Sequence, residues 1–191
     1  MALVCAITQV IAAGRRRHFY IYDLAGGQVE RVAGIVGRDE RSCEGFAASR
    51  AAGGPPLLAF YGNEGHIPLV SLKTRQAVGS LKMNGSVRTA AFSADGNQLL
   101  SSGSDGVVYV WDLRTQRCLS RAVDEGCLHA SSLATSADGR YVATGADSGV
   151  VNLYGYDALL KPSTSKFLPS SPKPLKTLMN LTTTIDTLCF K

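Results

Sequence analysis

Residues 99–114, LLSSGSDGVVYVWDLR, indicate the fold of this chain. A short run of apolar and small residues leads into a turn rich in Gly, Ser and Asp at 103–106. Residues 107–113 then alternate β-branched and aromatic side chains with a period of two, which is typical of a strand. The step from Asp105 to Gly106 supplies the positive φ that a tight connection between right-twisted strands requires. The stretch therefore predicts a β-hairpin.

The hairpin recurs along the chain at a nearly constant spacing. The tetrapeptide SADG at 93–96 reappears at 136–139, a shift of 43 residues, and LVSLKT at 69–74 matches the end of the hairpin at a shift of 41 residues. A repeat of about 40 to 45 residues made mostly of strands is typical of a propeller blade, one four-stranded antiparallel sheet. The sequence thus predicts an all-β chain, a partial β-propeller of about four blades, some incomplete, over residues 1–191.

The composition is consistent with such a fold and says less about partners. With 191 residues, of which 45% are hydrophobic, the chain has single-domain size and can bury a core. The formal net charge of +5 is compatible with a polyanionic partner such as RNA, but moderate positive charge also serves solubility alone.

The residue types that carry catalysis or bind metals are not grouped. No two of the five cysteines have a metal-ligand spacing, which favours reduced thiols in a cytosolic or nuclear protein. Asp95 and Asp138 each precede a glycine and are interpreted as turn formers. There is also no phosphate-binding glycine loop at a strand-to-helix junction and no nucleophile elbow. We therefore expect a protein that is not an enzyme, with no catalytic residue, cofactor, metal ion or small-molecule substrate.

The N-terminal segment combines an apolar run with a basic cluster. Residues 2–13 predict a buried propeller strand, because the run is too short to span a bilayer and the basic residues follow it, unlike a signal peptide. Two interpretations of Arg15, Arg16 and Arg17 stay open: a phosphate contact made by three guanidinium groups on a loop, or a solvated hairpin tip that resists edge pairing. No membrane partner is expected.

Two further segments depart from the strand pattern. Residues 33–54 match a blade poorly, and the propeller frame requires an inner strand at 43–48. Residues 157–173, rich in Pro, Ser and Lys, predict an exposed loop insertion between the third and fourth strands of a blade. This insertion is either a plain solvated loop or a segment that binds a partner or is phosphorylated at Ser171.

Because a propeller closes only when its last sheet meets its first, our hypothesis is that further blades are missing from this chain.

The run GSDGVVYVWDLRT at 103–115 resembles the WD-repeat signature, with Trp111 and Asp112 as its dipeptide. Longer stretches narrow the likeness: GSLKMNGSV at 79–87, VYVWDLRTQRCLSRAVDEGCL at 108–128, GVVNLY at 149–154 and PKPLKTLMNLTT at 172–183. Together they are similar to the small nucleolar RNA-associated WD-repeat proteins, which are subunits of the small-subunit processome. The similarity extends from about residue 19 to the end, although VDEG at 123–126 stands where a WD repeat ordinarily carries Gly-His.

The resemblance implies structural roles for several side chains. In WD repeats a Trp, a Ser or Thr, an Asp and a His form a buried hydrogen-bond chain within a blade. Ser101, Asp105 and Trp111 match three of these positions, and the His is missing. In the next blade Thr144 matches, whereas a tyrosine replaces the Trp and a serine stands at the position of the Asp.

The resemblance also implies a function. It predicts a non-catalytic scaffold or binding subunit of the nucleolar small-subunit processome, located in the nucleus, that supports pre-ribosomal RNA processing and small ribosomal subunit biogenesis. The implied partners are other processome proteins and, as a hypothesis, pre-ribosomal or small nucleolar RNA. Candidate contacts with RNA or a partner are Arg15, Arg16, Arg17, Arg114 and Arg117.

Two rival functions stay open at this point. One is a generic WD-repeat adaptor for protein–protein interaction, such as a ubiquitin-ligase receptor or a signalling scaffold. The other is an enzyme on a propeller frame, which would require carboxylates or metal ligands that converge at the central channel.

Overall fold

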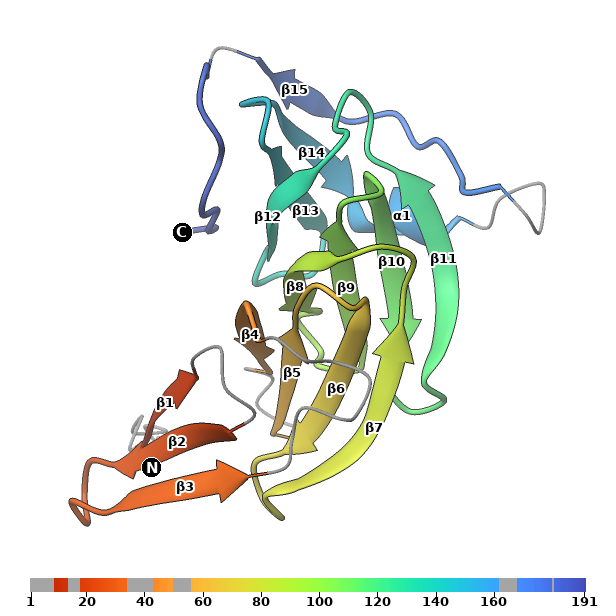
Figure 1. The fold of residues 1–191 in the computed structure, drawn as a ribbon. Coiled ribbons are helices and arrows are strands. Elements are labelled where there is room, and N and C mark those ends of the chain that lie inside the picture. Colours follow the sequence, from red (N-terminus) through yellow and green to blue (C-terminus); the bar gives the residue numbers. More distant parts are fainter. Residues whose placement is uncertain (1–8, 14–17, 34–42, 50–55, 162–167, 180) are drawn as a thin grey trace, which may run out of the picture.

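The computed structural model describes residues 9–13, 18–33, 43–49, 56–161, 168–179 and 181–191. Within these residues the chain forms four antiparallel sheets, which we number blades 1 to 4 in chain order, and one short helix. Figure 1 shows the blades following one another, with β4, β8 and β12 on the inner side of the arc. β8 contacts both β4 and β12.

The blade strands pair in chain order. Blade 1 has the strands β1 (Gln9–Ala13), β2 (His18–Asp23) and β3 (Val29–Ala33). Blade 2 has β4 (Gly45–Ala48), β5 (Leu57–Tyr61), β6 (His66–Ser71) and β7 (Gln76–Lys82). Blade 3 has β8 (Val87–Phe92), β9 (Gln98–Gly103), β10 (Val107–Asp112) and β11 (Arg117–Val123). Blade 4 has β12 (Ala130–Thr135), β13 (Tyr141–Ala146), β14 (Val151–Gly155) and β15 (Lys176–Leu178), with α1 (Tyr156–Leu160) between β14 and β15.

The architecture is an all-β, partial propeller, as the repeat spacing predicts. The hairpin at 99–114 is the β9–β10 pair, in which Tyr109 lies opposite Ser101 and Trp111 opposite Leu99. Gly106 in its turn has a φ of 66°, so the positive φ expected from the Asp-Gly step is confirmed. The inner strand required at 43–48 is also present, as β4.

The core consists of apolar layers between successive blades. Neighbouring residues of a strand point to opposite faces, so each inner or middle strand contributes to two layers. In β9, Leu99 packs with Trp111 in the layer between blades 2 and 3, whereas Leu100 packs with Val110 in the layer between blades 3 and 4. Both leucines are fully buried. Each such burial stabilises the fold by roughly 1.5–3 kcal/mol. Because both faces of these strands are buried, successive residues along them are nearly all apolar.

The first blade differs from its prediction in burial. Residues 9–13 of the apolar run do form a strand, but Val10 is 48% exposed, and on the neighbouring strand Tyr20 and Tyr22 are about equally open. The opposite face, with Phe19 and Ile21, is buried against blade 2. The prediction of a buried strand is therefore wrong for these residues, because no described sheet packs on the outer face of blade 1.

The predicted insertion at 157–173 lies between β14 and β15, but its described part is not wholly exposed. It includes most of α1, whose Leu159 is 1% exposed where the helix contacts β10 and β11. Further on, Ser170 forms a parallel bridge with the outer edge of β11. The expectation of an exposed insertion is wrong for these parts, because burial of an apolar side chain and pairing with a strand edge favour docking. Among the described residues, no helix has the length and apolarity needed to cross a membrane.

Residues 181–191 lie along blade 4 beside β12 and β13 (Figure 1). Ser131 Oγ donates to the carbonyl of Ile185 at 2.8 Å, and the Ile185 N–H donates to the carbonyl of Ala146 at 3.3 Å. Ile185 is buried. The segment has no regular secondary structure.

Candidate interaction surface and its buried supports

The predicted hydrogen-bond chain of blade 3 is present in part. The indole Nε1 of Trp111 donates to Ser101 Oγ at 2.9 Å, and both residues are buried. Asp105 lies apart from this pair, because its carboxylate accepts from the hydroxyl of Tyr109 at 2.7 Å. Burial and this contact raise the pKa of Tyr109 to about 12. Ser101 Oγ instead donates to the sulfur of Met83 at 3.6 Å, so a thioether stands in the place of the missing His.

In blade 4 a carboxylate takes the place of the missing His. Asp124 is 1% exposed, and its Oδ1 accepts hydrogen bonds from Asn152 Nδ2 at 2.8 Å and from the hydroxyl of Tyr154 at 2.9 Å. Burial and the neighbouring carboxylate raise the pKa of Tyr154, which keeps the hydroxyl protonated as a donor. Thr144 is buried at the position expected from the resemblance, but its Oγ1 has no partner among the described residues.

The residues that replace the His were missed in the sequence analysis, although a signal was present. KMNG at 82–85 and VDEG at 123–126 are separated by the repeat spacing of 41 residues and share a glycine in the left-handed region. Met83 and Asp124 therefore hold equivalent positions. Asp112, the remaining structural candidate, ends β10 and accepts from the Arg114 N–H at 2.9 Å, so it stabilises a turn.

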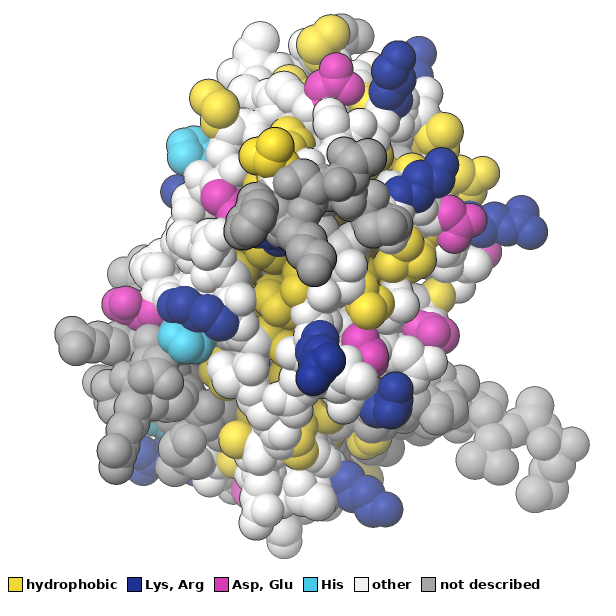
Figure 2. Space-filling view, turned by 90° about the vertical axis from the view of Figure 1, so that its right-hand side faces the viewer, with side chains coloured by type: hydrophobic (Ala, Val, Ile, Leu, Met, Phe, Trp, Pro, Cys, Tyr) yellow, Lys and Arg dark blue, Asp and Glu magenta, His cyan; other side chains and the backbone are white. Residues whose placement is uncertain are grey.

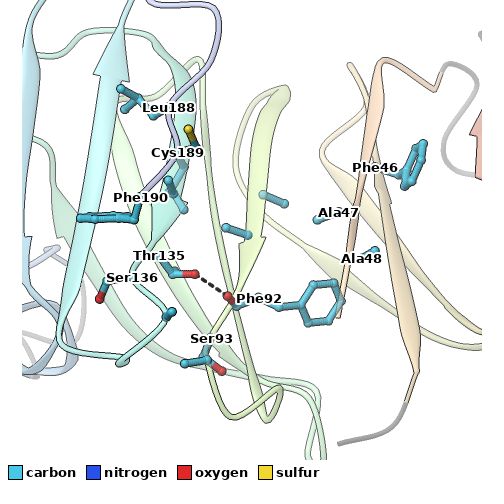
Figure 3. Close-up of a pocket in the computed structure, with 16 residues that line it drawn as sticks. Phe46, Ala47, Ala48, Phe92, Ser93, Thr135, Ser136, Leu188, Cys189 and Phe190 are labelled. Carbon is cyan, nitrogen blue, oxygen red and sulfur yellow. Dashed lines mark hydrogen bonds between the residues drawn. The ribbon is translucent and has the colours of Figure 1, made fainter. Parts of the chain in front are cut away.

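The inner strands surround a cavity of about 610 Å³ (Figure 3). It is lined by residues 46–48 of β4, 90–94 at the end of β8, 133–137 at the end of β12 and 188–190 of the C-terminal segment. None of these side chains is charged or an imidazole; Thr135, for example, donates to the carbonyl of Phe92 at 2.7 Å. The described lining contains no carboxylate and a single thiol, that of Cys189, and the described residues contain no group of three metal-ligating side chains.

The two predicted turn carboxylates have structural surroundings as well. Asp95 accepts from Ser93 Oγ at 2.5 Å, and Asp138 accepts from Ser136 Oγ at the same distance. These hydrogen bonds lower the pKa of both carboxyl groups, which suits permanently ionised turn residues rather than proton-transfer groups.

The candidate arginines divide into two groups. Arg15, Arg16 and Arg17 lie outside the described residues. Arg114 and Arg117 are exposed: Arg114 lies in the turn that connects β10 to β11, and Arg117 is the first residue of β11. Lys73 is exposed in the equivalent turn between β6 and β7.

These turns also link the blades. Arg75 Nε pairs with Glu30 of blade 1 at 3.3 Å, and Gln116 Nε2 donates to the Val78 carbonyl of blade 2 at 3.0 Å. Both turn residues have positive φ, at 59° and 55°. Figure 2 shows basic and acidic side chains interspersed on the side that carries the outer strands. This arrangement fits contacts made residue by residue rather than through one large basic field.

Cysteine reactivity gives a direct test of these surroundings. Burial, with Asp124 nearby, raises the pKa of Cys127 to about 12, so its thiol stays neutral at pH 8, and the side chain is itself buried. Since the thiolate is the nucleophile, we expect iodoacetamide to modify exposed Cys189 at least about tenfold faster than Cys127 or buried Cys43. Mass spectrometry of timed digests measures the rates. Equal rates at Cys189 and Cys127 in the folded chain would contradict the blade 4 arrangement.

Comparisons with known proteins agree with this geometry. A family model described as "WD domain, G-beta repeat" matches residues 75–112 and 125–154. The chain is 48% identical over 183 residues to the U3 small nucleolar RNA-associated protein 18 homolog of Arabidopsis thaliana, covering 96% of this chain and 32% of that protein. It is 39% identical over 171 residues to the human homolog of the same name, covering 90% and 29%.

The chain thus spans about one third of the length of the curated relatives that it matches. Among solved structures, it is similar to a chain of the polycomb repressive complex 2 of Chaetomium thermophilum, with a TM-score of 0.72 and 19% identity. That likeness covers 100% of this chain and 43% of the other, and shows a shared fold.

Proposed function

Because this chain belongs to the WD-repeat family and its relatives include the U3 small nucleolar RNA-associated protein 18 homologs, we propose that it is a scaffold subunit of the nucleolar processome. In this role it supports pre-ribosomal RNA processing and small ribosomal subunit biogenesis without performing catalysis. The observation that carries the proposal is the 48% identity to the Arabidopsis homolog over 96% of the chain.

The scaffold role also agrees with the way the blades are built. Stacked sheets with buried layers form a rigid frame, and turns at their ends present side chains at fixed positions. Arg114 and Arg117 project from one such turn, and guanidinium groups bind phosphates in a bidentate geometry. The proposed partners are processome proteins, together with small nucleolar or pre-ribosomal RNA.

The test is to deplete the endogenous protein and to express a tagged copy. We expect the tag in the nucleolus, U3 small nucleolar RNA in the purified complex, and accumulation of unprocessed small-subunit RNA precursor after depletion. A diffuse cytoplasmic signal, with normal precursor processing, would instead favour the generic WD-repeat adaptor, whose blades have the same construction.

The RNA contact has its own test, the double charge reversal R114E and R117E. We expect recovery of U3 small nucleolar RNA at about 150 mM salt to fall roughly tenfold, because two phosphate contacts become repulsive. Arg140→Glu is the control, since Arg140 is exposed in another turn and only loosely paired with Asp138 at 3.9 Å. If the double variant recovered as much U3 small nucleolar RNA as the original chain, with the complex intact, these two arginines would not contact RNA, and the scaffold would bind proteins only.

A further inference from the structure

The outer edges of blades 2 and 3 are formed by equivalent strands, β7 and β11. Each is the last strand of its sheet, and the 41-residue repeat aligns Lys82 with Val123 and Ser80 with Arg121. The backbone hydrogen bonds are equivalent too. The Met83 N–H donates to the Gly65 carbonyl within blade 2, and the Asp124 N–H donates to the Gly106 carbonyl within blade 3. Any backbone group that faces outward on β11 therefore has an equivalent on β7.

The edge of β11 is occupied by a segment of the chain itself. The Val123 N–H donates to the Ser170 carbonyl at 2.8 Å, and the Ser170 N–H donates to the Arg121 carbonyl at 2.7 Å. The hydroxyl of Ser170 donates to the same carbonyl at 3.1 Å. The pairing is parallel. It shows that the outer edge of a blade in this protein can accept a short extended segment by adding it as a strand.

No described segment covers the equivalent part of β7. Because the N–H and C=O of alternate residues in an edge strand point away from the sheet, the Ser80 carbonyl and the Lys82 N–H face outward. Both residues are exposed, and no described segment pairs with this edge at these positions. Among the described residues, this edge is contacted at the beginning of the strand, where Gln116 Nε2 donates to the Val78 carbonyl at 3.0 Å. The side that carries β7 and β11 in Figure 1 faces the viewer in Figure 2, where apolar side chains lie between charged ones.

We propose that the outer edge of β7 at Ser80 and Lys82 is a docking site for a short extended segment of a partner protein. The segment pairs in parallel, as Ser170 does on β11. The chain's own occupant, LPSSP at 168–172, indicates the chemistry: a small polar residue that donates its N–H to the Ser80 carbonyl, with neighbouring prolines that keep the segment extended. The proposal goes beyond the scaffold role, because it defines the kind of contact and holds for any partner with such a segment.

The experiment measures binding of a labelled synthetic peptide, LPSSPKP, to the whole chain by fluorescence anisotropy. The β11 edge is already occupied by the same sequence within the chain, so saturable binding is expected at β7. Lys82→Pro removes the outward N–H and should weaken binding about tenfold, whereas the control Lys82→Ala keeps this donor and should change binding less than about twofold. Thermal denaturation establishes that both variants fold.

A second measurement does not depend on any variant of the protein. A peptide N-methylated at its first serine, the equivalent of Ser170, cannot donate to the Ser80 carbonyl and should bind at least about tenfold more weakly. The proposal is overturned if the unmodified peptide shows no binding at millimolar concentration, or if Lys82→Pro binds it as well as the original chain does. It is also overturned if the chain self-associates and Lys82→Pro abolishes this, since a second copy is then the occupant.

Discussion

Trp111→Ala is expected to cost roughly 3–5 kcal/mol of unfolding free energy, enough to unfold a large fraction of the chain. The side chain is 5% exposed in the layer between blades 2 and 3, and its ring stacks on Tyr109 with 5.6 Å between centroids. Its removal leaves a cavity between two sheets and takes the indole donor away from Ser101. Urea titration followed by circular dichroism measures the change.

Two matched variants separate the causes. Trp111→Phe keeps most of the apolar volume and loses the hydrogen bond to Ser101, so it should cost about 1–2 kcal/mol. Arg117→Ala, at an exposed position of the same blade, should stay within about 0.5 kcal/mol. If Trp111→Ala and Arg117→Ala had equal midpoints, the layer between the blades would not be the main source of stability.

Asp124→Ala is expected to lower the unfolding free energy by about 3 kcal/mol, because it removes a buried hydrogen-bond acceptor. The substitution removes an acceptor that two buried donors share. The Tyr154 hydroxyl loses its acceptor with no bulk water to replace it, whereas Asn152 Nδ2 keeps its hydrogen bond to the Glu125 carbonyl at 2.8 Å. Asp124→Asn keeps a carbonyl acceptor and should lower the unfolding free energy by only about 1 kcal/mol. Glu125→Ala, one residue further on and exposed, serves as the control.

A double-mutant cycle then isolates the bond between Asp124 and Tyr154. Tyr154→Phe alone should destabilise the chain by about 1 kcal/mol, because it removes a hydrogen bond at 2.9 Å. In the background of Asp124→Ala the same substitution should cost less, since the hydroxyl no longer has its acceptor. Strictly additive costs would mean that the two side chains act independently and that Asp124 does not replace the missing His of the blade.

Local sequence patterns predicted most of the fold. Alternation in residues 107–113 indicated β10 and its two buried faces, and the shifts of 41 and 43 residues indicated that blades 2 to 4 are copies of one unit. These signals are available because strand periodicity and turn chemistry depend on residues that are neighbours in the chain. The failures lie where neighbours in space are decisive: Val10 is exposed, since no described sheet covers it, and Leu159 is buried by β10 and β11.

The contacts of the candidate site were also predicted only in part. The pairing of Trp111 with Ser101 was predicted from the matched positions of the repeat, and the two side chains are in contact. The replacement of the His by Met83 in one blade and by Asp124 in the next was not, because no local rule makes a thioether and a carboxylate equivalent. Their shared role appears only when each is seen beside its buried partners.

The sequence by itself determined that this chain is a series of strand repeats, because a period of two along each strand and a period of about 42 along the chain are properties of the linear order. Only the tertiary structure decided which side chains complete each blade and which strand edges are covered. The bonds from Asp124 to Tyr154 and from Arg121 to Ser170 join residues 30 and 49 positions apart. Such contacts depend on how whole sheets stack and where an insertion folds back, and no local pattern specifies either.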